Sequence, residues 1–427
     1  MRQLNVFLRR ICCAVFLSFS SLVFASPLSL IDAEDAALVS DPAIQRNDAL
    51  VASLSETAIA DGQLVDPKLT FGLFNLPNND FDLNKNPTTQ LRLGIKQALP
   101  KGDTLRLKKL KGEQYALAKA HQTQWLKRKT LLDVRLSYLE SFYYQGTFEI
   151  LNKNCRYFVD LLKTTENLYG VGRANQQDVL LAKLELSRLE DRINQAQNLL
   201  EINKTMLSKW VPAIQQQELE KKLPILEGLT SLKQMEEVLT HHPMVQIDDA
   251  LVLAAKQNVG MAEQQYKPGF NVGVEYRKRF GNELNGQHRE DLVAAMVTVE
   301  LPIFPEKRQD KRLSSSQYGY QAAKLKRSNT LRDMRQQLNQ HYGNWLRLTE
   351  RSERYKTYLQ QQASENTKAA LRAYQSGVAD FSTLLQARIT ELETHIQRNR
   401  IEVDRTKAQA QVLFYNASVQ QGESYEN

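Results

Sequence analysis

The residues best suited to chemistry in this 427-residue chain are two adjacent histidines, His241 and His242, followed by Pro243. Imidazole nitrogens are common zinc ligands, but a zinc site needs further histidine, cysteine or carboxylate groups to complete its ligand set. No such cluster accompanies the pair, and the seven methionines are scattered rather than grouped as soft-metal ligands. The histidines are therefore a weak metal-site candidate, and we expect neither a metal nor a cofactor.

Other patterns that carry catalysis are missing from the sequence. We find no H-E-x-x-H zinc motif, phosphate-binding glycine loop, nucleophile elbow or C-x-x-C pair. The carboxylates lie in charged stretches that are typical of solvated helix faces. A formal net charge of +8 over 427 residues is too small to indicate a nucleic-acid partner. The sequence thus predicts no catalytic residue, and an exported enzyme is the least supported class.

The first 25 residues have the organisation of a secretory signal peptide. Three arginines within the first ten residues precede a short apolar run, Ile11–Phe19, and Val23–Ala25 forms a small-residue cleavage site. The apolar run is well short of the roughly 20 residues that a spanning helix needs. We therefore expect a mature chain that starts near Ser26, and Cys155 is its only cysteine, so it can form no internal disulfide.

The rest of the chain contains the same order of landmarks twice, roughly 200 residues apart. The matched landmarks are Asp41-Pro42 and His242-Pro243, Pro67 and Pro268, Leu99-Pro100 and Leu301-Pro302, and Tyr169–Ala182 and Tyr374–Ala387. A steady offset across several landmarks indicates one structural unit duplicated in tandem. We place the first repeat at 26–228 and the second at 229–427.

Each repeat contains segments that alternate apolar and polar residues, which predicts a β-hairpin at about 69–99 and another at about 269–301. Strands of about 10 residues suit a tilted transmembrane strand, although a soluble half-buried sheet gives the same pattern. Four strands cannot close a barrel, and lipid tolerates no open sheet edge. If these strands span a membrane, several chains must contribute to one barrel.

Each repeat also contains a very long helical hairpin, at about 104–210 and about 307–420, preceded by shorter helices. The expected shorter helices are 28–39 and 43–60, with Asp41 as an N-cap, and 232–240 and 244–264. Positions that are mostly apolar step by three and four in the returning helices, from Leu186 to Leu200 and, with Asn399 and Thr406 among them, from Leu385 to Leu413. This spacing predicts helices that pack nearly parallel along a coiled-coil seam.

The hairpin turns, Tyr169–Ala182 and Tyr374–Ala387, share the frame Y-x-x-G-x-A followed five residues later by L-x-A. Together with the strand-ending prolines, this frame resembles the TolC-like outer membrane efflux protein family. The compact length and short C-terminal tail are similar to those of its heavy-metal exporter branch. The resemblance implies a mixed α/β membrane protein. Four transmembrane β-strands per chain would form a trimeric twelve-stranded barrel, continued by a long periplasmic α-helical coiled-coil barrel.

The resemblance also implies a function. The chain would be the outer-membrane exit duct of a tripartite efflux system, and would passively conduct cargo that an inner-membrane pump, of the RND type, delivers through a periplasmic adaptor protein. Its partners would be two further copies, the adaptor, the pump and outer membrane lipid. Heavy-metal cations are the expected cargo, and a multidrug or type I secretion duct fits the same sequence.

The resemblance assigns adaptor docking to the two periplasmic turns. The implied docking residues are Gly172, Arg173, Gly377 and Val378. Glycine suits a tight reversal because it adopts backbone conformations that other residues avoid, and termination of a helix alone would also explain it.

Some family members close the tip with aspartates, but the matching positions here hold Thr383 and Gln386, and Asp380 is the nearby acid. These three are candidate aperture-lining residues, and the sequence leaves open whether the tip has an acidic constriction. An alternative from another class is a soluble periplasmic coiled-coil adaptor or scaffold. That alternative explains the helical hairpins but leaves two β-hairpins with apolar faces unexplained.

Overall fold

The computed structural model describes residues 27–416, so the predicted signal peptide and mature start lie outside the described residues. The helices are α2 (Leu30–Ser40), α3 (Pro42–Asp61), α4 (Thr104–Gly170), α5 (Gln176–Leu207), α6 (Leu232–Val238), α7 (Pro243–Gln264), α8 (Gln309–Arg354), α9 (Gln360–Gln375) and α10 (Phe381–Phe414). The strands are β1 (Lys68–Phe74), β2 (Gln90–Leu99), β3 (Gly269–Arg279) and β4 (Leu292–Glu300). Short 3-10 turns, η1 (Pro212–Gln216) and η2 (Leu239–His241), and a π-helical segment, η3 (Tyr355–Leu359), complete the set.

The chain forms two compact units, each of which takes segments from both predicted repeats. The described part of the first, here called the tip unit, comprises 27–40, 133–226 and 347–407. The described part of the second, the sheet unit, comprises 41–132, 227–346 and 408–416. The helices α4, α8 and α10 each contribute to both units, and the predicted boundary between repeats stays a prediction.

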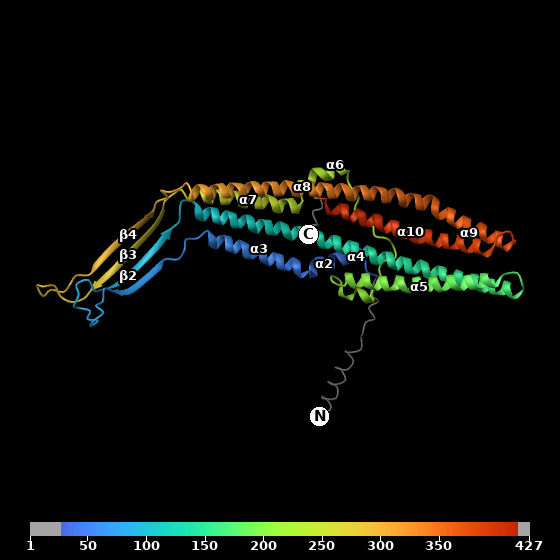
Figure 1. The fold of residues 1–427 in the computed structure, drawn as a ribbon, viewed down its shortest axis with the longest axis horizontal. Helices are drawn as coiled ribbons and strands as arrows, with labels where there is room; N and C mark the ends of the chain where they lie inside the picture. The colour runs from blue at the N-terminus through green and yellow to red at the C-terminus, as the bar shows by residue number, and fades with distance from the viewer. Residues whose placement is uncertain (1–26, 417–427) are drawn as a thin grey trace, which may run out of the picture. The chain divides into compact units, whose positions relative to one another are not determined.

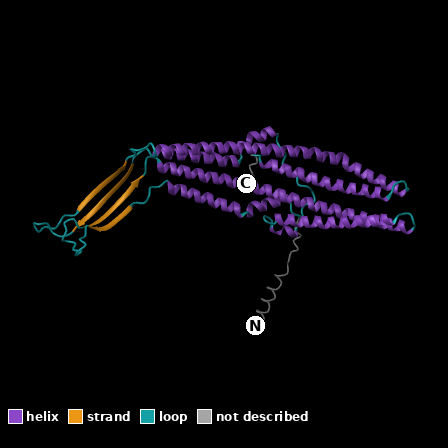
Figure 2. Cartoon of the chain, viewed as in Figure 1, coloured by secondary structure: helices purple, strands orange, loops and turns teal. Residues whose placement is uncertain are grey.

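The sheet unit contains one antiparallel sheet with the strand order β1-β2-β3-β4 (Figure 2), so the two predicted hairpins also pair with each other through β2 and β3. The predicted alternation is present, and the apolar face is exposed, with Leu69, Phe71 and Val293 each at least 70 % accessible. On the opposite face, Arg92 and Arg277 flank Glu275, with their Nε atoms 3.5 and 2.7 Å from its Oε1.

Helices α3, α7 and the first parts of α4 and α8 run side by side in the sheet unit (Figure 1). Close approach of α3 and α4 requires Gly112, because a Cβ there would lie 2.6 Å from the Cβ of Ala58. Asp41 is the predicted N-cap of α3: its Oδ1 accepts from the Ala43 N–H at 2.9 Å, and its Oδ2 accepts from Thr130 Oγ1 at 3.0 Å.

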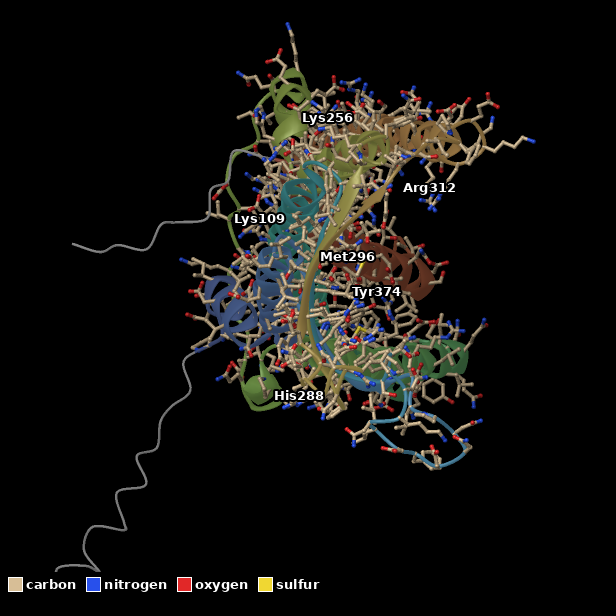
Figure 3. The ribbon with its side chains drawn as sticks, turned by 90° about the vertical axis from the view of Figure 1, so that its left-hand side faces the viewer. Lys109, Lys256, His288, Met296, Arg312 and Tyr374 are labelled. Atoms are coloured by element: carbon tan, nitrogen blue, oxygen red, sulfur yellow. The ribbon has the colours of Figure 1, made fainter. Side chains whose placement is uncertain are left out.

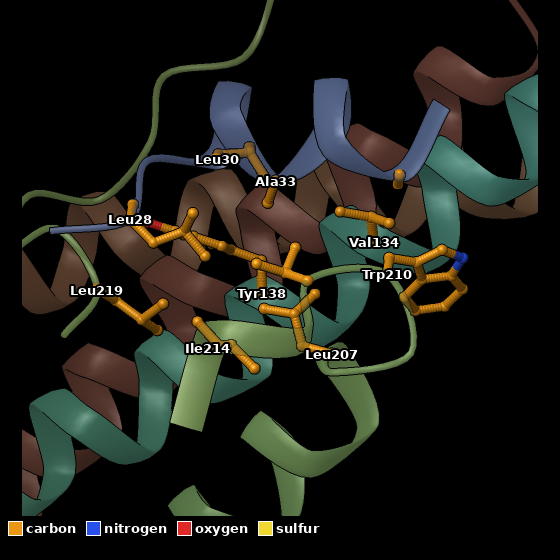
Figure 4. Packing of buried hydrophobic residues seen from close by; sticks show 11 residues of the cluster. Leu28, Leu30, Ala33, Val134, Tyr138, Leu207, Trp210, Ile214 and Leu219 are labelled. Carbon is orange, nitrogen blue, oxygen red and sulfur yellow. Dashed lines mark hydrogen bonds between the residues drawn. The ribbon is translucent and has the colours of Figure 1, made fainter. Parts of the chain in front are cut away.

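The tip unit has two buried clusters. One surrounds Tyr138, whose hydroxyl donates to the Leu28 carbonyl at 2.8 Å (Figure 4). The other joins the two helical hairpins through residues of α4, α5, α9 and α10. It contains Leu186, Leu189, Ile193, Ala196, Leu385, Ile389, Leu392 and Ile396, which confirms the predicted seams over this region.

Three element boundaries differ from the expectation. The second long helix is interrupted by the π-helical segment Tyr355–Leu359, which no proline or glycine signals. The expected helix 232–240 ends at Val238 and tightens into a 3-10 turn, and His242, the residue before Pro243, is extended with ψ of 137°. The first helix begins at Leu30 rather than 28, because Leu28 forms a parallel β-bridge with Leu219, in which the Leu28 carbonyl accepts from the Glu220 N–H at 3.2 Å.

Candidate functional site at the hairpin tips

The first hairpin turns from α4 into α5 at Gly172, whose φ is +74°. Its N–H donates to the Tyr169 carbonyl at 3.0 Å, and the N–H of Arg173 donates to the Leu168 carbonyl at 2.8 Å. This pair of bonds is the Schellman arrangement, which satisfies the last carbonyls of a helix when the next residue is left-handed.

The second hairpin repeats this backbone between α9 and α10. Gly377 also has φ +74°, its N–H donates to the Tyr374 carbonyl at 3.1 Å, and the Val378 N–H donates to the Ala373 carbonyl at 2.9 Å. A Cβ at Gly172 or Gly377 would meet no atom within 4 Å. Glycine is therefore favoured at both tips by the left-handed backbone and not by lack of space.

The returning helices are capped by different side chains. In the first tip the backbone N–H of Asn175 donates to Asp178 Oδ2 at 3.1 Å. In the second tip Asp380 is the cap, and its Oδ1 accepts from the backbone N–H of Thr383 at 2.9 Å and from its hydroxyl at 2.5 Å. These bonds from Thr383 lower the pKa of Asp380 below its ordinary value.

The three candidate aperture residues therefore have distinct environments. Asp380 is exposed but its carboxylate is engaged in capping α10, and Thr383 supplies the matching donors. Gln386 is exposed on the same helix. A role of Asp380, Thr383 or Gln386 in lining an aperture stays a prediction.

A cavity of about 700 Å³ lies between the two hairpins close to their turns. Arg173 from the first tip and Gly377 from the second both line it, whereas Gly172 and Val378 do not. Val378 is instead 83 % exposed beside the cavity. The structure thus brings one predicted residue from each tip to a shared cavity and leaves the other two at the surface.

Several residues that line this cavity were not predicted from the sequence. Tyr157 of α4 and Arg388 of α10 both line it and contact each other, with the guanidinium carbon 5.1 Å from the ring centroid. Leu384 also lines it and is 1 % exposed. Apolar spacing marks Leu384 as a helix-face residue, but no local signal pairs positions 157 and 388.

His242 is the buried member of the histidine pair. His242 is fully buried, its Nδ1 accepts from the Met244 N–H at 3.2 Å, and its Nε2 lies 3.1 Å from the Phe414 carbonyl oxygen. Both ring nitrogens are thus engaged, and Nε2 carries the proton. Burial, and secondarily the charge of Arg128, lowers the pKa of His242 to about 4. This histidine caps α7 and has no nitrogen left for a metal.

Within residues 27–416, no group of three or more histidine, cysteine or acidic side chains is arranged to hold a metal ion. In the same range, every helix is too short or too polar to cross a membrane.

Residues 235–415 match the family model described as outer membrane efflux protein. No curated protein matches the chain. Among solved structures, the outer membrane protein VceC of Vibrio cholerae aligns over 91 % of this chain and 96 % of its own, with a TM-score of 0.73 at 17 % identity. The CmeC outer membrane channel of Campylobacter jejuni aligns over 92 % and 87 %, with a TM-score of 0.75 at 12 % identity.

CusC, for which transmembrane channel formation is described, aligns over 90 % of this chain and 91 % of its own, with a TM-score of 0.73 at 14 % identity. The TM-scores of 0.73–0.75 establish a shared fold over nearly the whole described chain. The mixed α/β fold expected from the sequence is therefore confirmed.

Proposed function

The chain belongs to the outer membrane efflux protein family, and from this premise we propose that three copies assemble into the exit duct of a tripartite efflux system. As an outer membrane efflux channel, it is located in the outer membrane and has a large periplasmic helical part. In the proposed duct an adaptor and an inner-membrane pump deliver the cargo. The chain's own residues supply a path and a gate, and none is catalytic.

The four-stranded sheet is the observation that supports assembly of several copies into one barrel. Its apolar face is exposed, and β1 and β4 are edge strands, each paired on one side only among the described residues. An apolar face suits lipid, but open edges would leave unpaired backbone groups in the membrane at a cost of several kcal/mol each. Pairing of β4 with β1 of the next copy removes both edges, and three copies give a twelve-stranded barrel.

Docking of the adaptor at Gly172, Arg173, Gly377 and Val378 is supported by the geometry of the tips. The cavity between the hairpins is open, combines apolar walls with two arginines and one acid, Asp160, and includes residues of both turns. An adaptor segment with apolar side chains and a carboxylate would fit this chemistry.

The test is complementation of a deletion strain by Gly172→Glu and Gly377→Glu variants. A side chain at a left-handed position costs about 1–2 kcal/mol, and glutamate also adds charge and bulk at the tip. We expect loss of resistance while trimers in the outer membrane fraction stay intact. Gly172→Asn and Gly377→Asn are matched controls, because asparagine tolerates this backbone, and they should retain resistance.

Unchanged resistance in both glutamate variants would reject docking at the tips. Recovery of the wild-type mature chain from the soluble periplasm would reject the duct itself. The same deletion strain, grown on gradients of metal salts, dyes, detergents and antibiotics, separates a heavy-metal exporter from a multidrug duct.

A further inference from the structure

A groove of about 890 Å³ lies between α7 and the start of α8 in the sheet unit. Four basic side chains line it: Lys307, Arg308, Lys311 and Arg312. Within the described part of the chain, no carboxylate lines this groove, and none of the four basic side chains forms an ion pair. Asn258 and Gln265 of α7 add side-chain amides to the opposite wall. The groove is therefore lined by four positive charges, and the two acids of the same stretch, Glu306 and Asp310, do not line it.

The groove opens on one defined side of the helix layer. On α8, Asp310 accepts from the Tyr266 hydroxyl at 2.5 Å, and Asn339 donates to Glu236 of α6 at 2.6 Å. At about 100° per residue, Arg312 and Ser315 lie roughly 140–200° around the helix from Asp310. Figure 3 shows α6 at the upper left and Arg312 on the right. The groove thus faces away from α6.

The sheet continues this charge bias. Its polar face carries Lys68, Arg92, Lys96, Arg277 and Arg279 against Glu275 and Glu300. Lys68 is directly opposite Lys96, and Arg92 is directly opposite Arg277. Like charges in register are unfavourable unless something compensates them, and Glu275 serves only the Arg92–Arg277 pair. The face turned away from lipid in the proposed barrel is therefore also net positive.

We propose that the groove binds oxyanionic groups, carboxylate or phosphate, on cargo that passes through the duct, and that the duct is anion-selective. The inference rests on the proposed duct, in which the polar sheet face and the groove both line the interior. Guanidinium groups bind such oxyanions through paired hydrogen bonds, and lysine ammonium groups add point charge. Three copies would set twelve positive charges just below the barrel. This cargo class departs from the bare metal cations suggested by the resemblance.

The first experiment measures reversal potentials of purified full-length mature trimers in planar bilayers, across a KCl gradient near 0.1 M. At this ionic strength charges act over about 10 Å, so a lining charge controls selectivity, and the effect should shrink at 1 M. We expect the wild type to prefer Cl⁻ and Lys311→Glu/Arg312→Glu to shift toward K⁺. The control Lys324→Glu/Arg332→Glu, an equal charge change nearer the Asp310 face of α8, should leave the reversal potential unchanged.

The second experiment measures binding of tripolyphosphate to the detergent-solubilised protein and does not require conduction. Loss of two charge-assisted contacts in Lys311→Glu/Arg312→Glu should weaken binding at least about tenfold, with no change in the control. Absence of trimers and conductance would reject the proposed duct, while the binding result still decides whether the groove is an anion site.

Two outcomes overturn the inference even where channels conduct. One is a wild type that prefers K⁺ or does not bind tripolyphosphate. The other is an unchanged reversal potential in Lys311→Glu/Arg312→Glu, together with weaker retention of this variant than of the wild type in nanodiscs that contain phosphatidylglycerol. That result would assign the groove to lipid headgroups instead of cargo.

Discussion

The two hairpin tips have the same turn and different supports. Both use a left-handed glycine with the same two backbone hydrogen bonds. At the second tip, the first residue of α10 is Phe381, which is 1 % exposed and packs edge-to-face on Tyr374. The equivalent first residue of α5 is Gln176, which is exposed. The second tip is thus anchored in the core of the tip unit, whereas the first is held mainly by its backbone and cap.

The same contrast occurs where the shorter helices begin. Asp41 and His242 each precede a proline and cap the helix that follows, yet one is an acid bonded to Thr130 and the other a buried neutral imidazole bonded to the Phe414 carbonyl. Duplicated backbone geometry therefore tolerates replacement of the side chains that stabilise it. Stability and pH response can then differ between the two copies.

The largest expected effect is at the second tip. Phe381→Ala should destabilise the tip unit by about 3–5 kcal/mol, because it removes a buried aromatic side chain and leaves a cavity. Gln176→Ala, the matched change at the first tip, should be nearly neutral. Thermal unfolding in detergent with hydrogen exchange of both turns would measure this difference, and equal effects of the two variants would contradict unequal anchoring.

The next effect is a pH dependence contributed by His242. Its pKa is about 4 in the folded chain against an ordinary value of 6.5, so the unfolded chain binds more protons between these values. Stability should therefore fall as pH decreases from 6.5 to 4, by up to about 3 kcal/mol per chain. Apparent Tm between pH 7 and 4 would show it.

His242→Asn is the control for this prediction, since asparagine keeps a capping oxygen but does not titrate. It should reduce the loss of Tm at low pH. A variant that loses stability in acid as steeply as the wild type would assign the pH dependence to other groups.

The smallest expected effect separates the two caps at the tips. Asp380→Ala removes the N-cap of α10, whereas Asp178→Ala removes an acid one turn into α5. Loss of the N-cap should accelerate amide exchange at Thr383 severalfold, and loss of Asp178 should change exchange less. A reversed order would show that the first turn of α5 depends on Asp178 more than α10 depends on Asp380.

Much of the fold was predictable because its signals are local. Alternation identified the two β-hairpins, the steps of three and four identified the seam from Leu186 to Ala196, and the position of Asp41 before Pro42 identified a cap. The π-helical segment at Tyr355 escaped prediction because no residue type signals it. The cavity at the tips escaped because Tyr157 and Arg388 are distant in sequence.

The sequence by itself determined the duplicated order of elements, the two glycine turns and the apolar strand faces, because each depends on neighbours within a few residues. Tertiary structure alone decided that Arg173 and Gly377 share a cavity, that both nitrogens of His242 are engaged, and that Lys311 and Arg312 line a groove together with residues of α7. Those facts depend on which helices pack together and on which faces. Local periodicity places a residue on a face but does not choose the partner of that face.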